Sequence, residues 1–277
     1  MESLEAKVAV ITGAASGIGL GMAREFGREG MRVVLSDVSE EHLNNTVTEL
    51  QSDGIECIGE VADVRSAAAV DALAQTAVET YGQVHVICNN AGVGVFGRQW
   101  ELSEQDWAWA VDICLWGVIN GVRAFVPRML DSEVPCHVVN TASMGGLLSA
   151  PFVGPYATAK HAVVGLSKSL RAELGGTNVG VTLVCPGNVR TDVARTMRER
   201  HDAQRRGGSA DLDAFLNLLA TGLQDENAMD PADDGKLVVQ AIKTNQFWLL
   251  PNGAPQLPMV EADFEEMRSS SSSFVTE

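Results

Sequence analysis

Residues 7–19 read K-V-A-V-I-T-G-A-A-S-G-I-G, a short β-branched strand followed at once by a glycine-rich turn and a helical run that ends near Gly30. Glycines in such a turn let the backbone approach a pyrophosphate group, which then lies on the N-terminus of the helix. The spacing is G-x-x-x-G-x-G rather than the commoner G-x-G-x-x-G. A purely structural turn would use the same glycines. The position between strand and helix nevertheless favours a nucleotide site, formed by Gly13, Ser16, Gly17, Ile18 and Gly19.

Strands and helices continue to alternate along the chain. Strands are predicted at residues 32–36, 55–61, 84–88, 136–141, 179–185 and 247–250, and helical runs at 40–53, 66–81, from Ser103, from Pro155 to Gly175 and from Pro231. With no internal repeat and no linker, this pattern predicts one α/β domain over residues 6–260. Its polar segment, about residues 190–228, follows a strand end, where a substrate lid would lie. The serine-rich end, residues 261–277, is predicted to be a flexible tail.

The overall charge limits the partners. The 277 residues include 36 acidic and 20 basic side chains, and the net charge of −16 argues against nucleic acid and anionic membrane as partners. We find no apolar run long enough to span a bilayer and no signal peptide, so we expect a cytoplasmic protein that does not bind membranes. The five cysteines are scattered without a C-x-x-C pair, which is typical of reduced cytosolic thiols and predicts no metal site.

Acidic residues follow two of the predicted strands. Asp37 suits a hydrogen bond to the ribose of an adenosine and would repel a 2′-phosphate, so it favours NAD over NADP. The alternative is that Asp37 caps the next helix, a role that Ser39 could fill instead. Asp63, with Val64 beside it, ends the third strand, where it could reach an adenine amino group or equally serve a turn.

Small residues follow the fourth strand, and a proline-glycine turn follows the sixth. Asn90, Ala91 and Gly92 permit close packing against a flat ring system. The later turn reads P-G-N-V-R-T over residues 186–191. Ligands of open α/β sheets bind at the carboxyl ends of the strands, which is where these turns would lie.

A tyrosine and a lysine stand four residues apart near the start of the helix that opens at Pro155. On a helix, Tyr156 and Lys160 lie on one face, one turn apart. A free phenol titrates at about 10, and a nearby ammonium group favours the phenolate. Ser143, at the end of the fifth strand, supplies a hydroxyl for a substrate oxygen. The three would make a proton-transfer site for an alcohol or a carbonyl; the alternative is an exposed helix with an incidental tyrosine and lysine.

Together these pieces resemble the short-chain dehydrogenase/reductase family. The matching motifs are T-G-A-A-S-G-I-G (12–19), N-N-A-G (89–92), the spacing from Ser143 to Y-x-x-x-K, and P-G-x-V-x-T (186–191), in the family order and over residues 6 to about 250. The resemblance implies a doubly wound Rossmann fold with a seven-stranded parallel sheet and helices on both faces. It also implies an NAD(P) cofactor and a homodimer or homotetramer built on the two helices that follow Ser103 and Pro155.

The resemblance also assigns roles to individual residues. Tyr156 would be the acid/base, Lys160 would hold the nicotinamide ribose and favour the phenolate, and Ser143 would bind the reacting oxygen. Residues 90–92 would contact the middle and the adenosine side of the cofactor. The turn after the sixth strand would meet its nicotinamide end, with cofactor-binding residues Pro186, Gly187, Val189 and Thr191.

One position departs from the family pattern. The family usually has Asn in N-L-x-G-V on the long helix, whereas this chain reads C-L-W-G-V over residues 114–118. That Asn helps to place a water in the proton path from the lysine, and a thiol is a poor hydrogen-bonding substitute. The main-chain carbonyl at this position could still hold the water. Cys114 is therefore predicted to be one of the catalytic residues. The alternative is a cofactor- or ligand-binding protein of this fold with weak catalysis.

The predicted lid and the neighbouring loops carry apolar side chains: Phe96, Leu147, Leu148 and Phe152 in the loops, and Leu212, Phe215, Leu216, Leu218 and Leu219 in the lid. They favour a fairly apolar substrate, such as a cyclic, aromatic or steroid-like molecule, although amphipathic helices also need apolar faces for packing. The sequence therefore predicts an NAD-dependent oxidoreductase that interconverts a secondary alcohol and a ketone.

Overall fold

The computed structural model describes residues 1–191 and 210–272 and has one parallel sheet at its centre. The strand order is β3-β2-β1-β4-β5-β6-β7, with every neighbouring pair parallel. The strands are β1 (Val8–Thr12), β2 (Arg32–Asp37), β3 (Cys57–Val61), β4 (Val86–Asn89), β5 (Cys136–Thr141), β6 (Val179–Val184) and β7 (Trp248–Leu249). The predicted fold class is confirmed. The strand order reverses between β1 and β4, and such a switch point is where doubly wound sheets bind ligands.

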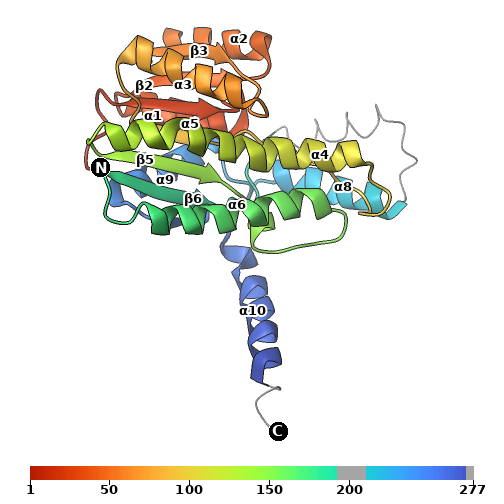
Figure 1. Cartoon of the computed structure of the whole chain (residues 1–277). Coiled ribbons are helices and arrows are strands. Elements are labelled where there is room, and N and C mark those ends of the chain that lie inside the picture. Colours follow the sequence, from red (N-terminus) through yellow and green to blue (C-terminus); the bar gives the residue numbers. More distant parts are fainter. Residues whose placement is uncertain (192–209, 273–277) are drawn as a thin grey trace.

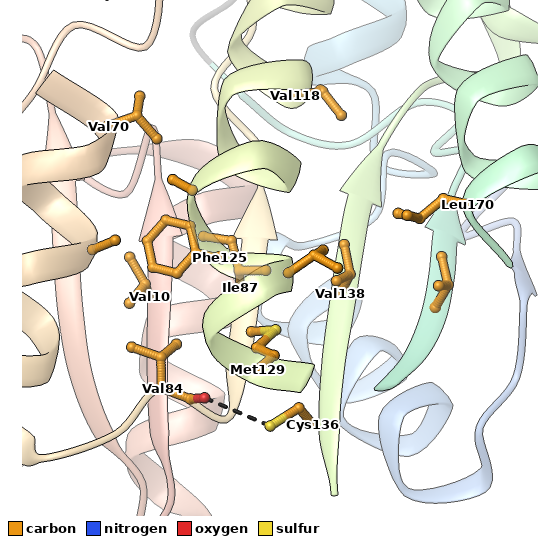
Figure 2. Packing of buried hydrophobic residues seen from close by; sticks show 14 of the residues in the cluster. Val10, Val70, Val84, Ile87, Val118, Phe125, Met129, Cys136, Val138 and Leu170 are labelled. Atoms are coloured by element: carbon orange, nitrogen blue, oxygen red, sulfur yellow. Dashed lines mark hydrogen bonds between the residues drawn. The ribbon is translucent and has the colours of Figure 1, made fainter. Parts of the chain in front are cut away.

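Helices cover both faces of the sheet, because side chains alternate along each strand. Val8 and Val10 of β1 pack under α3 (Ala67–Tyr81), α5 (Gly117–Asp131) and α6 (Gly154–Glu173). Ala9 and Ile11 pack under the helices of the other face, which are α1 (Gly17–Arg28), α2 (Glu40–Ser52) and α9 (Pro231–Thr244). Figure 2 shows the first core, where Phe125 of α5 lies among residues of the sheet.

Helices α1 and α9 meet at their backbones. A Cβ atom on Gly21 would lie 2.0 Å from the carbonyl oxygen of Pro231, and one on Gly235 would lie 2.6 Å from that of Gly21. Any side chain at Gly21 would therefore push the two helices apart.

The long tryptophan-rich helix contains a π-helical segment. It runs as α4 (Glu104–Val111), η1 (Asp112–Trp116) and α5, and begins at a capping box formed by Ser103 and Asp106. By length and composition, Glu104–Asp131 is apolar enough to cross a membrane, which corrects the prediction that no such run exists. Because 56% of its most apolar window is buried in the fold, it has the character of a core helix.

The C-terminal region differs most from its prediction. After η3 (Ala254–Gln256), the helix α10 (Leu257–Ser272) covers most of the expected flexible tail and extends away from the body of the molecule (Figure 1). Its apolar side chains recur with helical spacing at Leu257, Val260, Phe264 and Met267, a pattern that favours a helix. Within the predicted lid, the helix α8 (Ala210–Gln224) is described, whereas residues 192–209 and 273–277 lie outside the described residues.

Candidate active site

The glycine turn after β1 leaves the N-terminus of α1 open. Ser16 is the N-cap residue, but its side chain makes no capping hydrogen bond. Gly13 has φ +65°, and a Cβ atom on Gly19 would lie 2.1 Å from the carbonyl oxygen of Gly13, so this tight path requires glycine. Ile18 is half-buried and packs against the core below the turn. The exposed N–H groups and the positive end of the helix dipole therefore fit a phosphate group.

Asp37 ends β2 beside this turn. Its Oδ2 accepts a hydrogen bond from the backbone N–H of Ala15 (3.2 Å), and its Oδ1 accepts one from Ser39 N (3.1 Å). The N-cap residue of α2 is Ser39, whose hydroxyl accepts from His42 N (3.4 Å). Ser39 therefore takes the capping role that was the alternative for Asp37, and the Asp37 carboxylate stays next to the glycine turn.

The residues after β3 are held within their own turn. Asp63 pairs with Arg65, with 2.6 Å between Oδ2 and Nη2, and this hydrogen bond holds the pKa of Asp63 below its usual range. Val64 is buried, and its carbonyl oxygen accepts from Asn120 Nδ2 (2.9 Å). Asp63 therefore serves the turn, as one of the two alternatives predicted. Asn120, which holds the backbone of Val64 in place, was not predicted from the sequence.

The segment after β4 is tied to the end of β1. Thr12 Oγ1 accepts from the backbone N–H groups of Asn90 (3.0 Å) and Ala91 (3.1 Å), while Asn90 Nδ2 donates to Thr12 O (3.0 Å). Thr141 Oγ1 donates to Asn90 Oδ1 (3.3 Å), which extends the network to β5. The hydrogen bonds hold the carboxyl ends of three strands in one rigid group.

Ser143, Tyr156 and Lys160 come together at the end of β5. Ser143 opens η2 (Met144–Gly146), and its Oγ accepts from Gly145 N (3.0 Å). A Cβ atom placed on Gly145 would lie 3.5 Å from Ser143 Oγ and 3.2 Å from Tyr156 Cε1, so both side chains border the same small space. Lys160 is buried, with its Nζ 5.8 Å from the centroid of the Tyr156 ring and donating to Thr141 O (2.8 Å).

Cys114 lies in the π-helical segment η1, next to the lysine. A Cβ atom on Gly92 would lie 3.4 Å from Lys160 Nζ and 3.7 Å from Cys114 Sγ. The thiol donates to Val93 O (3.2 Å) and accepts from Val93 N (3.3 Å). Both hydrogen-bonding functions of the thiol are thus engaged by the backbone that follows the N-N-A-G motif.

The turn after β6 reaches the same edge of the sheet. Pro186 O accepts from Met144 N (2.9 Å), which joins the turn to the residue after Ser143. Val189 is buried and forms a parallel bridge with Met229. Thr191 reaches the glycine turn, since a Cβ atom on Gly17 would lie 3.1 Å from its Cγ2. A pocket of about 390 Å³ adjoins this contact and is lined by Ser16, Gly17, Arg24, Arg190 and Thr191, among others.

Three phenylalanines from separate segments form an aromatic cluster beside Tyr156. The Phe96 ring lies 6.1 Å from the Tyr156 ring and 5.7 Å from the Phe215 ring, between centroids. The Phe152 ring lies 5.6 Å from Phe215, which belongs to α8. Phe152 has φ +71°, unusual for a bulky residue, and its carbonyl oxygen accepts from Gly97 N (2.8 Å). Of the other candidate pocket residues, Leu147 and Leu148 are half-buried against the core.

A second polar network behind the site was missed in the sequence. Asn89 Nδ2 donates to Asn140 Oδ1 (2.8 Å), and Asn140 Nδ2 donates to Ser167 Oγ (3.0 Å). All three side chains are buried, so these hydrogen bonds join β4, β5 and α6 inside the core. The only signal was an asparagine within each of two apolar strands, because buried polar side chains need partners.

Comparison with known proteins agrees with this architecture. The model of the short chain dehydrogenase family matches residues 7–202. The chain is 41% identical over 194 residues to the 1-deoxy-11-beta-hydroxypentalenate dehydrogenase of Streptomyces avermitilis, which is 69% of this chain and 72% of that protein. This protein therefore belongs to the short-chain dehydrogenase/reductase family of oxidoreductases.

Two solved structures illustrate the likeness. A short chain dehydrogenase/reductase from Burkholderia phymatum, in complex with NAD, has a TM-score of 0.91 and 39% identity over 98% of this chain and 97% of that one. A variant of actinorhodin polyketide ketoreductase, with NADPH, has a TM-score of 0.77 and 35% identity over 90% of this chain and 97% of that one.

Proposed function

We propose that this protein is an NAD-dependent dehydrogenase that interconverts a secondary alcohol and a ketone on a fairly apolar substrate. The observation that carries the proposal is that Ser143 and Tyr156 border one small space at Gly145, with Lys160 Nζ 5.8 Å from the centroid of the Tyr156 ring and the aromatic cluster beside it. A related enzyme is named for its hydroxypentalenate substrate and another is named a polyketide ketoreductase, which supports hydroxyl and ketone groups as the reacting class.

The residues around the glycine turn fit a dinucleotide. The open N-terminus of α1 would hold the pyrophosphate, Asp37 the adenosine ribose, and Lys160 the nicotinamide ribose. Val64 and residues 90–92 would border the adenosine side, and the turn 186–191 the nicotinamide end. When bound, the nicotinamide supplies the hydride acceptor or donor for the substrate carbon.

The proton is handled by the side chains of the chain itself. In the oxidative direction, the Tyr156 phenolate takes the hydroxyl proton of the alcohol, and in the reductive direction the phenol returns it to the carbonyl oxygen. The buried Lys160 ammonium group lies 5.8 Å from the centroid of the Tyr156 ring, so a positive charge stands next to the side chain that exchanges the proton. The Ser143 hydroxyl donates a hydrogen bond to the reacting oxygen, where negative charge builds up. The aromatic cluster excludes water and offers an apolar surface.

NAD is the proposed cofactor because Asp37 lies at the end of β2 with no compensating basic residue in the glycine turn. A 2′-phosphate placed there would meet a carboxylate. One solved relative holds NAD and another holds NADPH, so the chain's own residues carry this choice.

A binding protein with weak catalysis is the second candidate. The observation that favours it is the thiol of Cys114, whose donor and acceptor functions are both taken by Val93. In that case Cys114 would hold the loop after N-N-A-G and would not serve a proton path from Lys160.

We also propose a cytoplasmic homotetramer. The five cysteines are free and buried, which fits a reducing compartment. Trp116 on the long helix is 46% exposed, and a large aromatic side chain on a helix surface suits an interface between copies. Sedimentation of the Trp116→Glu variant tests this: the wild type should sediment as a tetramer and the variant as a smaller species.

The decisive experiment measures NADH formation from NAD with a panel of aliphatic, cyclic and aromatic secondary alcohols, in parallel with NADP. Tyr156→Phe should abolish turnover, whereas Tyr81→Phe, which changes the other tyrosine of the chain, should leave it intact. Turnover that survives Tyr156→Phe would refute the assigned base. NADH binding without turnover on any alcohol or matching ketone would favour the second candidate.

A further inference from the structure

Asn252, in the turn after β7, joins two segments that lie far apart along the chain. Its Nδ2 donates to the carbonyl oxygens of Asn188 (2.9 Å) and Asn227 (3.0 Å). Asn188 belongs to the turn after β6, and Asn227 follows α8. Both N–H donors of one side-chain amide are therefore used on backbone carbonyls of two different segments.

The two segments are also paired with each other. Arg190 N donates to Met229 O (2.9 Å), and Met229 N donates to Asn188 O (3.0 Å), around the parallel bridge between Val189 and Met229. Asn188 O thus accepts from both Met229 and Asn252. We call residues 188–190 and 227–229 the paired segments.

The backbone around Asn252 fixes its place relative to the site. Gly187 N donates to Pro251 O (2.8 Å), and a Cβ atom on Gly187 would lie 2.3 Å from the carbonyl oxygen of Asn252. On the other side, a Cβ atom on Gly253 would lie 2.9 Å from Met144 Sδ, in the residue after Ser143. The turn therefore touches both the element that carries Ser143 and the one that leads to Val189 and Thr191.

The local conformation and the chemistry both require asparagine. Asn252 has φ +51°, a left-handed conformation that asparagine tolerates better than most residues. Glycine would keep the conformation and lose both donors, and aspartate would face two carbonyl oxygens with a carboxylate. Asn245, with φ +53°, offers a contrast because it is the C-cap residue of α9 and ends a helix.

We propose that Asn252 is a positioning residue that holds the paired segments together and thereby keeps Val189 paired with Met229 and Thr191 against the glycine turn of α1. It also anchors the end of α8, since Gly222 of that helix lies against Asn188, where a Cβ atom would be 3.2 Å from Nδ2. The effect on turnover rests on the proposed function, whereas the fastening of the paired segments does not.

Hydrogen–deuterium exchange of the free protein tests the fastening directly. The variants are Asn252→Asp and Asn252→Gly, with Asn245→Gly as the matched control at another left-handed asparagine. Asn252→Asp should raise the exchange rates of the Arg190 and Met229 amides about tenfold or more, because each hydrogen bond contributes about one factor of five to ten. Asn252→Gly should do so more weakly. Unchanged exchange at these amides, or an equal rise throughout the chain, would overturn the proposal.

Steady-state kinetics separate the positioning role of Asn252 from the effect of replacing any left-handed asparagine. With NAD and an alcohol that the wild type oxidises, Asn252→Asp should raise the KM for both by about tenfold and change kcat by less. Asn245→Gly keeps a left-handed helix end that glycine favours and should move neither KM. Equal KM changes in the two variants would refute a positioning role. A wild type without turnover would refute the proposed function and leave the exchange result to decide on Asn252.

Discussion

A buried carboxyl group on α9 should make the stability of this protein depend on pH. Asp234 is fully buried, and among the described residues neither of its oxygens has a hydrogen-bond partner. Burial raises its pKa from 3.8 to about 7. Between these pH values the folded protein holds a proton that the unfolded chain has released. Stability therefore falls as the pH rises through this window and stays lower above it.

The size of the effect follows from the two pKa values. The difference between 3.8 and about 7, at about 1.4 kcal/mol per pH unit, gives about 4 kcal/mol of destabilisation at pH 8. The amide dipoles at the start of α9 favour the anion and offset up to about 1 kcal/mol of this. Asp234→Asn removes the charge and keeps the shape. The change in unfolding free energy caused by Asp234→Asn should be more stabilising at pH 8 than at pH 4 by about 3 kcal/mol.

Thermal unfolding at pH 4, 6 and 8 measures this prediction. For a domain of this size, 3 kcal/mol corresponds to roughly 6–12 °C in melting temperature. Asp233→Asn is the matched control, because Asp233 is exposed and pairs with Lys236 at 2.7 Å. The reasoning is refuted if the change in melting temperature on Asp234→Asn is the same at all three pH values, or if Asp233→Asn shows the same pH dependence.

Three further predictions concern the site. Asp37→Ala should lower the preference for NAD over NADP by about tenfold, measured as the ratio of kcat/KM values, since a like charge no longer faces the 2′-phosphate; an unchanged ratio would mean that Asp37 does not face the ribose. Cys114→Asn should preserve or raise kcat, because an amide can donate to and accept from Val93 as the thiol does, whereas complete loss of turnover in a folded variant would contradict this account. Phe215→Ala should lower kcat/KM for aromatic and cyclic alcohols by about tenfold, because it removes two aromatic contacts. Phe264→Ala on α10 is the control and should leave kcat/KM unchanged. Equal losses in both variants would count against the aromatic cluster as a substrate surface.

The sheet and the edge that carries the site were predictable from the sequence. The strands are short apolar runs, and the glycine turn, Asp37, the N-N-A-G motif, Ser143 and the turn 186–191 each follow one, so parallel strands bring them to one edge. The grouping of Tyr156 with Lys160 followed from helical periodicity, because the two lie one turn apart. The strand bounds were less accurate: β4 begins at Val86 rather than 84, since hydrogen bonding with the neighbouring strands sets where a strand begins.

Features that depend on tertiary packing were not predictable. Phe96, Phe152 and Phe215 were predicted as apolar residues of the loops and the lid, but no spacing along the chain encodes the contacts of their rings with one another and with Tyr156. The π-helical segment around Cys114 has no compositional signal. The helix α10 was missed for a different reason, because the serine run at its end hid the helical spacing of its apolar residues.

The backbone contact between α1 and α9 has an energetic consequence. Because Gly21 meets Pro231 with no side chain between, a displacement of one helix passes to the other without being absorbed by flexible side chains. The N-terminus of α1 is the proposed site of the pyrophosphate, and α9 receives the chain that returns from α8. Any coupling free energy that this contact carries between the proposed dinucleotide and the proposed substrate is reciprocal. The factor by which the proposed dinucleotide tightens binding of the proposed substrate therefore equals the factor by which that substrate tightens binding of the dinucleotide, and titrating each ligand in the presence of the other measures the same factor.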